Sequence, residues 1–498
     1  MGVGFLYVEG HYAPLGWSLL KRREPEIVAD VPFRAEPGAP VPVVCIVKDA
    51  HFHPVRLDQV SIRVWYPSDR VRELRFRIDE EVSQPLWCKV FRFDPEERGD
   101  MEVEVLFYGS RKGRPLLVRN DNLRTASHRP FRVLASPYPL PEVEDWYYGD
   151  AHFHSSYTWD QAEFGAPLRA AVEAARAIGL SWFAATDHSY DLDDREGSYL
   201  QNDPGLPKWR NFLKEVEDID FPVLAGEEVS CGSTRGHNLH LLAFGIREFV
   251  EGKGDSGERW LRTRPDLSLR EALDRVLAQG GVAYAAHPLF RFPFPQRVLL
   301  GRGSWTWEDL RAEGLSGLQF WNGRRGGDFE EGKGVWVRLL LEGRRVYALG
   351  GNDAHGDFNR FRGLSIPLLK VKELPFYTFG RVRTAAYCPD GPSPEAILEA
   401  LKEGRTVVTD GPMVLVRAEG ARWDAEAVST EEFGKVVELR VYFGDLGKRK
   451  ESVLWRGGRG MRTWARGSIP PGPGYLRAET ETEGGALGLT NPVWLEHG

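Results

Sequence analysis

Hydrophobic and polar residues alternate along the first part of the chain with the period of a β-strand. Residues 74–78 alternate between apolar side chains and arginine, and residues 101–105 alternate between apolar side chains and glutamate. Successive residues of a strand point to opposite faces, so this pattern is typical of antiparallel strands with one buried face. Residues 1–140 are therefore predicted to form a β-sandwich domain. The proline-rich segment 136–141 predicts a stiff linker after it.

Between residues 145 and 410, short apolar runs alternate with segments of helical periodicity. Residues 166–178 carry an apolar stripe at helical spacing, and the apolar run 180–185 follows. Residues 268–271 have the sequence of a capping box, which opens another helix before the apolar run 282–286. Repeated strand–helix units with short connections predict a parallel sheet that curls into a barrel.

The last part of the chain, residues 411–498, returns to strand-like alternation, with turns rich in glycine and proline. It is predicted to form a small C-terminal β domain. A chain of 498 residues is too long for one ordinary core. We therefore expect three domains, with residues 1–140, 145–410 and 411–498.

Composition limits the partners and the location of the protein. The formal net charge is -7 and no block of basic residues occurs, so neither nucleic acid nor an anionic membrane surface is expected as a partner. No apolar run approaches the roughly 18 residues of a membrane span, and the N-terminus lacks the features of a signal peptide. The four cysteines are scattered without metal-binding or disulfide spacing. A reducing, cytoplasmic location is expected.

Polar side chains with metal-binding chemistry gather at the ends of the predicted strands. His152 and His154 are two residues apart on a strand, so both imidazoles face the same side and supply half of a metal site. The other candidates that follow or open apolar runs are Asp187, His188, Glu228, His240, His287, Asp353 and His355. Because the carboxyl ends of parallel strands meet at one rim, this placement predicts a site for several metal ions.

Five segments resemble the motifs of the polymerase-and-histidinol-phosphatase (PHP) superfamily of metal-dependent hydrolases. They are Asp150-Ala-His-Phe-His-Ser155, Ala185-Thr-Asp-His188, Gly226-Glu-Glu228, Ala286-His-Pro288 and Gly351-Asn-Asp-Ala-His355. The layout after them, with residues 393–412, is similar to a branch that includes carbaryl-hydrolase-like enzymes with extra β domains.

This resemblance implies a fold, a cofactor and a set of ligands. The fold would be a distorted (β/α)7 barrel, here flanked by the N-terminal β-sandwich and the small C-terminal β domain. The cofactors would be two or three divalent ions of zinc, manganese or iron. The resemblance assigns one ion to His152, His154, Glu228 and Asp353, a second to Glu228, His240 and His287, and a third to His188 and His355.

Three positions leave alternatives open. Asp160 is the candidate for a further ligand of the third ion, but the intervening Trp159 makes its spacing unusual. Of His237 and His240, we expect His240 to be the ligand and His237 to contact the substrate or a ligand. Asp187 is expected to orient an imidazole and not to bind the metal itself.

The expected reaction is hydrolysis of a small phosphomonoester or phosphodiester by a metal-activated hydroxide. The sequence has neither a serine-nucleophile motif nor a glycine-rich phosphate loop with lysine. Arg291 is a candidate to clamp the phosphate, although an ordinary surface arginine is the alternative. The same alternative holds for the other loop arginines, Arg324, Arg325, Arg360 and Arg362.

Two other functions remain open at this stage. The same metals would serve a carboxylic ester or carbamate hydrolase, or they would be structural ions in a non-catalytic binding protein. Both the phosphoesterase and the carboxylic ester or carbamate hydrolase would act on a small molecule. The flanking β domains either narrow the mouth of the barrel or mediate oligomerisation.

Overall fold

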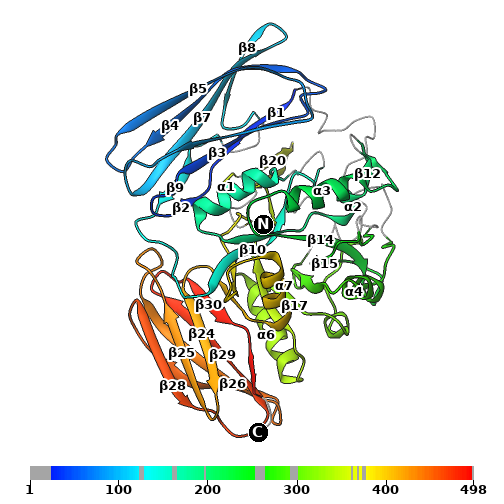
Figure 1. The fold of residues 1–498 in the computed structure, drawn as a ribbon, viewed down its shortest axis with the longest axis vertical. Coiled ribbons are helices and arrows are strands. Elements are labelled where there is room, and N and C mark those ends of the chain that lie inside the picture. Colours follow the sequence, from blue (N-terminus) through cyan, green and yellow to red (C-terminus); the bar gives the residue numbers. More distant parts are fainter. Residues whose placement is uncertain are drawn as a thin grey trace.

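The structure, a computed structural model, describes residues 24–122, 128–159, 165–195, 198–252, 264–291, 301–360, 363–366, 369–372 and 377–495. Three parts follow one another along its long axis. The N-terminal strands lie at one end, the C-terminal strands lie at the other, and the helix-bearing middle part lies between them (Figure 1).

The N-terminal part consists of two sheets with a shared core. One sheet has the order β1 (Glu26–Asp30), β3 (Val41–Lys48), β6 (Leu86–Phe93). The other has the order β2 (Arg34–Ala35), β9 (Phe131–Ala135), β7 (Gly99–Arg111), β4 (Val55–Trp65), β5 (Val71–Val82), with β8 (Arg114–Arg119) paired to β7. Val43 and Val60, one from each sheet, are fully buried in the same cluster. Burial of such β-branched side chains between two sheets is what holds them face to face.

The middle part is built on seven neighbouring strands. Their order is β10 (Trp146–His154), β11 (Trp182–Ala185), β14 (Val223–Gly232), β15 (Asn238–Phe244), β16 (Val282–Ala286), β17 (Gly317–Asn322), β18 (Tyr347–Gly351). The strands β10, β11 and β14 are parallel, and so are β16, β17 and β18. The strand β15 between these two groups is antiparallel to both of its neighbours.

The prediction of a distorted (β/α)7 barrel is wrong. The first half of β10 pairs with the antiparallel strand β22 (Arg383–Tyr387), whereas β18 lies close to β10 but, among the described residues, forms its strand pairing with β17. From β22 the sheet continues through β23 (Thr406–Thr409), β30 (Leu487–Thr490), β29 (Gly474–Thr482), β26 (Val436–Asp445) and β27 (Lys450–Gly457). The result is one long mixed sheet. Strands make up 46% of the described residues and helices only 15%, which is far from a helix-rich barrel.

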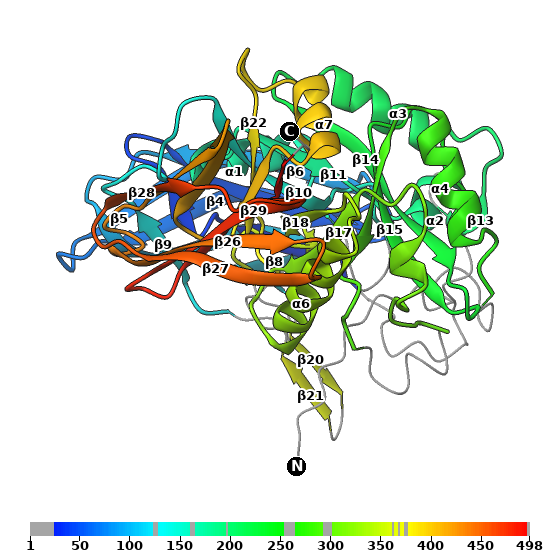
Figure 2. The ribbon, with the colours of Figure 1, turned by 90° about the horizontal axis from the view of Figure 1, so that it is seen from below.

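The helices lie on the outside of the middle strands. They are α1 (Leu168–Ile178), α2 (Ser189–Leu192), α3 (Pro207–Glu217), α4 (Leu269–Ala278), α6 (Gly327–Leu341), α7 (Pro394–Glu403) and the short 3-10 helix η1 (Asp309–Arg311). The capping box predicted at Ser268 and Glu271 is formed at the start of α4. Figure 2 shows α2, α3 and α4 at the end of the molecule opposite the two β parts. Among the described residues, no helix combines the length and the apolar character needed to cross a membrane.

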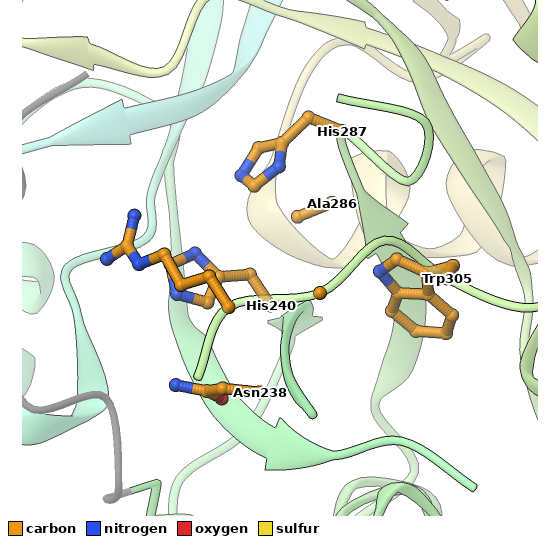
Figure 3. A pocket seen from close by; sticks show the side chains of 7 residues that line it. Asn238, His240, Ala286, His287 and Trp305 are labelled. Atoms are coloured by element: carbon orange, nitrogen blue, oxygen red, sulfur yellow. The ribbon is translucent and has the colours of Figure 1, made fainter. Parts of the chain in front are cut away.

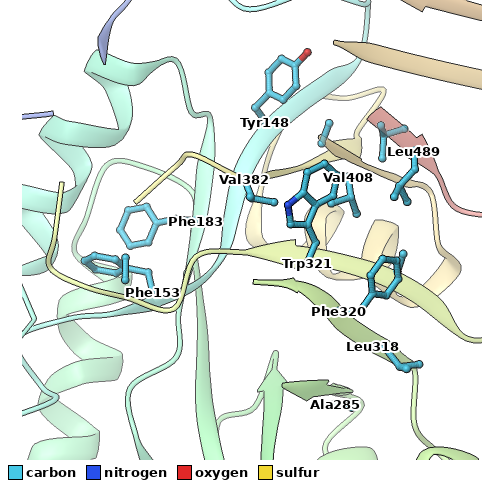
Figure 4. Close-up of a cluster of buried hydrophobic side chains, with 14 of the residues drawn as sticks. Tyr148, Phe153, Phe183, Ala285, Leu318, Phe320, Trp321, Val382, Val408 and Leu489 are labelled. Carbon is cyan, nitrogen blue, oxygen red and sulfur yellow. The ribbon is translucent and has the colours of Figure 1, made fainter. Parts of the chain in front are cut away.

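The C-terminal strands share their core with the middle part. A separate sheet of β24 (Met413–Glu419), β25 (Arg422–Val428) and β28 (Arg462–Ser468) completes this end of the molecule, and β31 (Val493–Leu495) pairs with β29. The buried cluster in Figure 4 runs from Phe153 on β10 to Val408 on β23 and Leu489 on β30. The middle sheet thus extends into the C-terminal part without a break in hydrophobic packing. The domain boundaries at 140 and 410 stay predictions.

Four short strands form two small hairpins beside the main sheet. They are β12 (Asp194–Arg195) with β13 (Ser198–Asn202), and β20 (Gly363–Ile366) with β21 (Leu369–Lys372). The two-residue strand β19 (Ala354–His355) pairs in parallel with the end of β10. This pairing places residues 353–355 beside His154.

A buried arginine joins the three parts of the molecule. The guanidinium of Arg34 is fully buried and donates hydrogen bonds to Glu432 in the C-terminal part at 2.8 Å. It also donates to the carbonyl oxygen of Ile178 at the end of α1, at 2.9 Å, and to Glu36 at 2.8 Å. A buried charge is stabilising only when it is paired and its hydrogen bonds are satisfied, and these partners meet both conditions.

Candidate metal centre

The strand ends of the middle part bring eight of the nine predicted metal ligands together. His152 and His154 end β10, His188 follows β11, and Glu228 lies in β14. His240 lies in β15, His287 follows β16, and Asp353 and His355 follow β18. Asp160, the ninth candidate, lies outside the described residues.

Glu228 is the carboxylate on which the histidines converge. Its Oε1 atom lies 2.9 Å from His240 Nδ1 and 3.0 Å from His287 Nε2. Its Oε2 atom lies 3.1 Å from His188 Nδ1. The side chain is fully buried. A carboxylate with nitrogen atoms near both oxygens has the arrangement needed to bridge two cations.

Asp353 completes a second group with the histidine pair of β10. Its Oδ1 atom lies 3.3 Å from His152 Nε2 and 3.2 Å from His154 Nε2. The two Nε2 atoms are only 3.1 Å apart. Nitrogen lone pairs that close together in a buried site point at a common cation-sized space.

Three sets of candidate ligand atoms lie within 4.8 Å of one another among the described residues. They are His152, His154, Glu228 and Asp353; His188, Glu228 and His240; and His154, His188 and His355. The first set is the one that the sequence motifs assigned to a single ion. In the other two, His188 joins Glu228 and His240, and His154 joins His355. The number of ions and the identity of their ligands stay predictions.

Charge and burial oppose each other in this cluster. Burial alone would lower the pKa of His154, but the carboxylates of Asp353 and Glu228 overcome this effect and raise the pKa to about 10. Burial alone would raise the pKa of Glu228, but His240 and His152 hold it well below its usual range. The site therefore stabilises carboxylate anions beside groups that can carry positive charge.

The chemistry of the cluster fits divalent cations. His188 Nε2 is buried and has no hydrogen-bond partner among the described residues. Because an unsatisfied buried polar atom is costly, this nitrogen is suited to bind a cation. Imidazole nitrogen and carboxylate oxygen together are the ligands that zinc, manganese and iron accept. Zinc, manganese or iron therefore suits the residues that are present.

Two of the candidate ligands have strained backbones. His287 has a φ of 28° and Asp353 has a φ of 52°, both in the left-handed region that residues with a Cβ atom rarely adopt. Such conformations persist where the surroundings impose them, and they gather at functional sites. Here each turn directs a side chain from the end of its strand back towards Glu228 or His152.

Asp187 holds the turn that follows the histidine pair. Its Oδ1 atom accepts hydrogen bonds from the backbone N–H groups of Ser155 and Thr158, each at 2.8 Å. The hydroxyls of the same two residues donate to the carboxylate at 2.7 and 2.8 Å. The Nδ1 atom of His154 lies 3.3 Å from Thr158 Oγ1. Thr158 thus links Asp187 to His154, and the expected role of Asp187 as an orienting residue stays a prediction.

Two residues near the cluster were not anticipated from the sequence. Gln319 and Asn322 lie on β17, whose residues are all buried, and both side chains reach the candidate ligands. A buried glutamine and asparagine within an apolar strand are the sequence signal that could have identified them, because buried polar side chains require partners.

The other predicted site residues lie away from the cluster. His237 is exposed in the turn before β15, so the structure brings only His240 of this pair to Glu228. Arg291 is exposed and pairs with Glu331 at 2.9 Å. Arg360 is buried against Asp357, and Arg325 pairs with Asp410. Arg324 is half-buried, whereas Arg362 lies outside the described residues.

A pocket opens beside the cluster. It is lined by Asn238, His240, Ala286, His287, Arg302, Gly303 and Trp305. Figure 3 shows the rings of His240 and His287 on one side of it and the indole of Trp305 on another. Arg302 is 2% exposed, and the backbone pairing of residues 301–303 with Asn238 places it there. The side-chain amide of Asn238 is buried without a hydrogen-bond partner among the described residues, as expected for a group that contacts a ligand.

Comparisons with known proteins do not place the chain in the PHP superfamily. No family model matches it, and no curated protein matches it. The solved structures it resembles include a calcium-binding mutant of Bacteroides uniformis beta-glucuronidase 2 and the beta-D-mannosidase of Dictyoglomus thermophilum. The first is 11% identical, with 94% of this chain covering 60% of that one at a TM-score of 0.19. The second is 9% identical, with 92% of this chain covering 64% of that one at a TM-score of 0.23.

These findings correct the predicted family. No family model supports the PHP superfamily, and the described strands form one long mixed sheet in place of the predicted barrel. The solved structures named above are a beta-glucuronidase and a beta-D-mannosidase. At TM-scores near 0.2 the glycoside hydrolases themselves carry no conclusion on fold or activity. The function therefore has to be argued from the site.

Proposed function

We propose that the protein is a metal-dependent hydrolase that acts on a small phosphoester. The observation that carries this proposal is the buried convergence of seven side chains, His152, His154, His188, Glu228, His240, Asp353 and His355, in three overlapping sets of ligand atoms. A structural zinc site closes its shell with about four ligands. A larger set that shares one carboxylate is typical of open sites with more than one catalytic ion.

Divalent ions held here would lower the pKa of a water molecule and stabilise negative charge on the attacked group. The chain's own residues supply the rest. Glu228 and Asp353 would hold the ions together with the histidines, and Asp187 would keep His154 in place through Thr158. The surrounding burial excludes bulk water from the charges.

The pocket beside the cluster supports an anionic substrate. Arg302 brings a guanidinium to the side of His240 and His287, and guanidinium groups bind phosphate oxygens with two parallel hydrogen bonds. The Asn238 amide offers a further donor at the same place. Trp305 forms an apolar wall, which suits an aromatic leaving group and keeps an aryl ester or carbamate as the second candidate substrate.

The proposal is tested by metal analysis combined with activity assays. The purified protein, loaded in turn with zinc, manganese and iron, would be assayed with p-nitrophenyl phosphate, bis-p-nitrophenyl phosphate and p-nitrophenyl acetate. We expect two or more ions per chain and phosphoester turnover that is lost in His152→Ala and Asp353→Ala. His128→Ala, at an exposed histidine remote in the sequence from the cluster, is the matched control and should keep both properties.

Other outcomes would change the conclusion. Turnover of the acetate alone would favour the carboxylic ester hydrolase. Less than one ion per chain and no turnover after reconstitution would refute the hydrolase and leave a binding protein.

A further inference from the structure

The strand β17 ends in two buried polar side chains beside the candidate ligands. Gln319 is fully buried and Asn322 is 8% exposed, within a strand whose every residue is buried. An amide that is taken out of water without partners costs several kcal/mol, roughly 2–7 by transfer measurements. The hydrogen bonds of Gln319 and Asn322 therefore offset this cost and show which groups the two side chains hold in place.

Gln319 and Asn322 form a chain of hydrogen bonds between two candidate ligands of the same ion. Asn322 Nδ2 donates to Asp353 Oδ2 at 3.2 Å, and Gln319 Nε2 donates to Asn322 Oδ1 at 3.3 Å. Gln319 Oε1 lies 2.9 Å from His152 Nδ1. The chain thus begins at one ligand, Asp353, and ends at another, His152.

The chemistry of each group fixes the direction of this chain. An ionised carboxylate only accepts hydrogen bonds, so Asn322 must turn its NH₂ group to Asp353 and its oxygen to Gln319. Gln319 must then use its NH₂ group for Asn322 and its oxygen for His152. The backbone N–H of His287 also lies 3.4 Å from Gln319 Oε1, and a backbone N–H can only donate. Both ends of the chain therefore give the same orientation of the Gln319 amide.

We propose that Gln319 and Asn322 are positioning residues that keep a proton on Nδ1 of His152 and so make its Nε2 atom the metal ligand. The inference rests on the proposed metal centre. The imidazole has one proton in its neutral form, and Gln319 Oε1 requires that proton at Nδ1. The Nε2 lone pair then faces Asp353 Oδ1 at 3.3 Å. Asn322 binds Oδ2 of Asp353, and the other oxygen, Oδ1, faces the Nε2 atoms of both His152 and His154.

An independent chain has the same effect on the second histidine. Thr158 gives its single hydroxyl proton to Asp187 at 2.8 Å, so its oxygen can only accept from His154 Nδ1 at 3.3 Å. His154 would therefore also use Nε2. This agrees with the 3.1 Å separation of the two Nε2 atoms, which share one space.

The experiment compares the full-length protein with Gln319→Met and Gln319→Glu. Methionine has a similar length and cannot serve as a strong acceptor, whereas glutamate keeps an acceptor for His152 Nδ1. Zinc affinity would be measured by competition with a chelator, and histidine tautomers would be read by two-bond ¹H–¹⁵N NMR on zinc-loaded, ¹⁵N-histidine-labelled protein. The signal of His152 would be assigned by its loss in His152→Gln.

In the parent protein we expect His152 to show the proton on Nδ1. Gln319→Met should lose this fixed tautomer and bind zinc about 10–100-fold more weakly, as when partners of metal-binding histidines are removed. Gln319→Glu should keep the Nδ1–H signal. Asn322→Leu, which removes the link to Asp353 without touching His152, should weaken zinc binding less and serves as the second variant if Gln319→Met does not fold.

The outcomes separate this inference from the proposed function. If the parent binds no metal, the proposed function fails. If the parent binds zinc and Gln319→Met keeps both the affinity and the tautomer, the positioning role alone is refuted. A proton on Nε2 of His152 in the zinc-loaded parent refutes it as well.

Discussion

Glu228 is the carboxylate on which the candidate histidine ligands converge, and its sequence neighbour Glu227 provides an internal control. Glu228→Gln replaces the anion that faces His188, His240 and His287 with a neutral amide. We expect it to remove at least one ion per chain and to lower the rate of hydrolysis by more than about 100-fold. Even the loss of a residue that only hydrogen-bonds to a metal ligand lowers metal affinity or activity by about 10–100-fold.

The control variant is Glu227→Gln. Glu227 is equally buried, but burial raises the pKa of its carboxyl well above the usual value, so that an amide resembles its protonated form. This variant should keep its metal content, measured by elemental analysis. Equal loss of metal in both variants would show that any change in this strand disrupts the site and would contradict a specific role for Glu228.

Metal binding is expected to release protons. The pKa of His154 is raised to about 10 in the metal-free protein because Asp353 and Glu228 outweigh the opposing effect of burial. A cation must therefore displace a proton from this ring at neutral pH. Zinc affinity should rise with pH between 7 and 10, and calorimetry in buffers of different ionisation enthalpy should show release of at least one proton. A pH-independent affinity would contradict this.

At the residue scale the sequence indicated the candidate ligands but not their partners. His152, His154 and Asp353 could be recognised because each follows an apolar run, and strand ends meet in space. This signal does not identify Gln319 or Arg302. The position of Gln319 depends on the pairing of β17 with β16 and β18. The position of Arg302 depends on the backbone pairing of Asn238 with residues 301–303. Neither pairing is encoded in local periodicity.

At the scale of single elements, the close approach of β18 to β10 depends on Gly351. A Cβ atom at this position would lie 2.8 Å from the Cβ atom of His152 and 3.1 Å from Gln319 Nε2. Gly351→Ala is therefore expected to lower the free energy of unfolding by about 1–3 kcal/mol, as overpacking does, and to weaken zinc binding by displacing His152.

Gly334→Ala in α6 is the matched control for this prediction. Apart from its chain neighbours and the backbone of its own helix, no atom lies within 4 Å of a Cβ atom at Gly334, and alanine favours a helix over glycine by roughly 0.5–1 kcal/mol. Thermal unfolding should show a higher melting temperature for Gly334→Ala and a lower one for Gly351→Ala. An unchanged zinc affinity in Gly351→Ala would show that His152 does not depend on this contact.

For the elements, the prediction failed in the relative direction of neighbouring strands. The strands β15 and β16 are antiparallel, yet both are buried along their whole length. A strand that is buried on both faces is apolar throughout, so its composition does not reveal whether its neighbour runs parallel or antiparallel. The helices were easier to predict, since α1 carries its apolar stripe and ends at Gly179 in the left-handed conformation.

At the scale of the whole molecule, Arg34 is expected to be essential for stability. Arg34→Met would leave Glu432 without its buried partner, and breaking such a pair by removing one member costs about 3–5 kcal/mol. Arg77→Met, at an ion pair whose arginine is 87% exposed, is the control and should cost at most about 1 kcal/mol. Calorimetry would compare the two, and equal melting temperatures would contradict a joining role for Arg34.

The unbroken sheet from β10 through β23 to β30 has a consequence for shortened forms of the chain. A polypeptide that stopped near residue 410 would expose the free side of β23, where Val407 and Thr409 now pair with β30. An uncovered strand edge is a template on which other chains pair, and it leads to aggregation. Premature termination or proteolysis at this point is therefore expected to yield insoluble material and not a smaller folded protein.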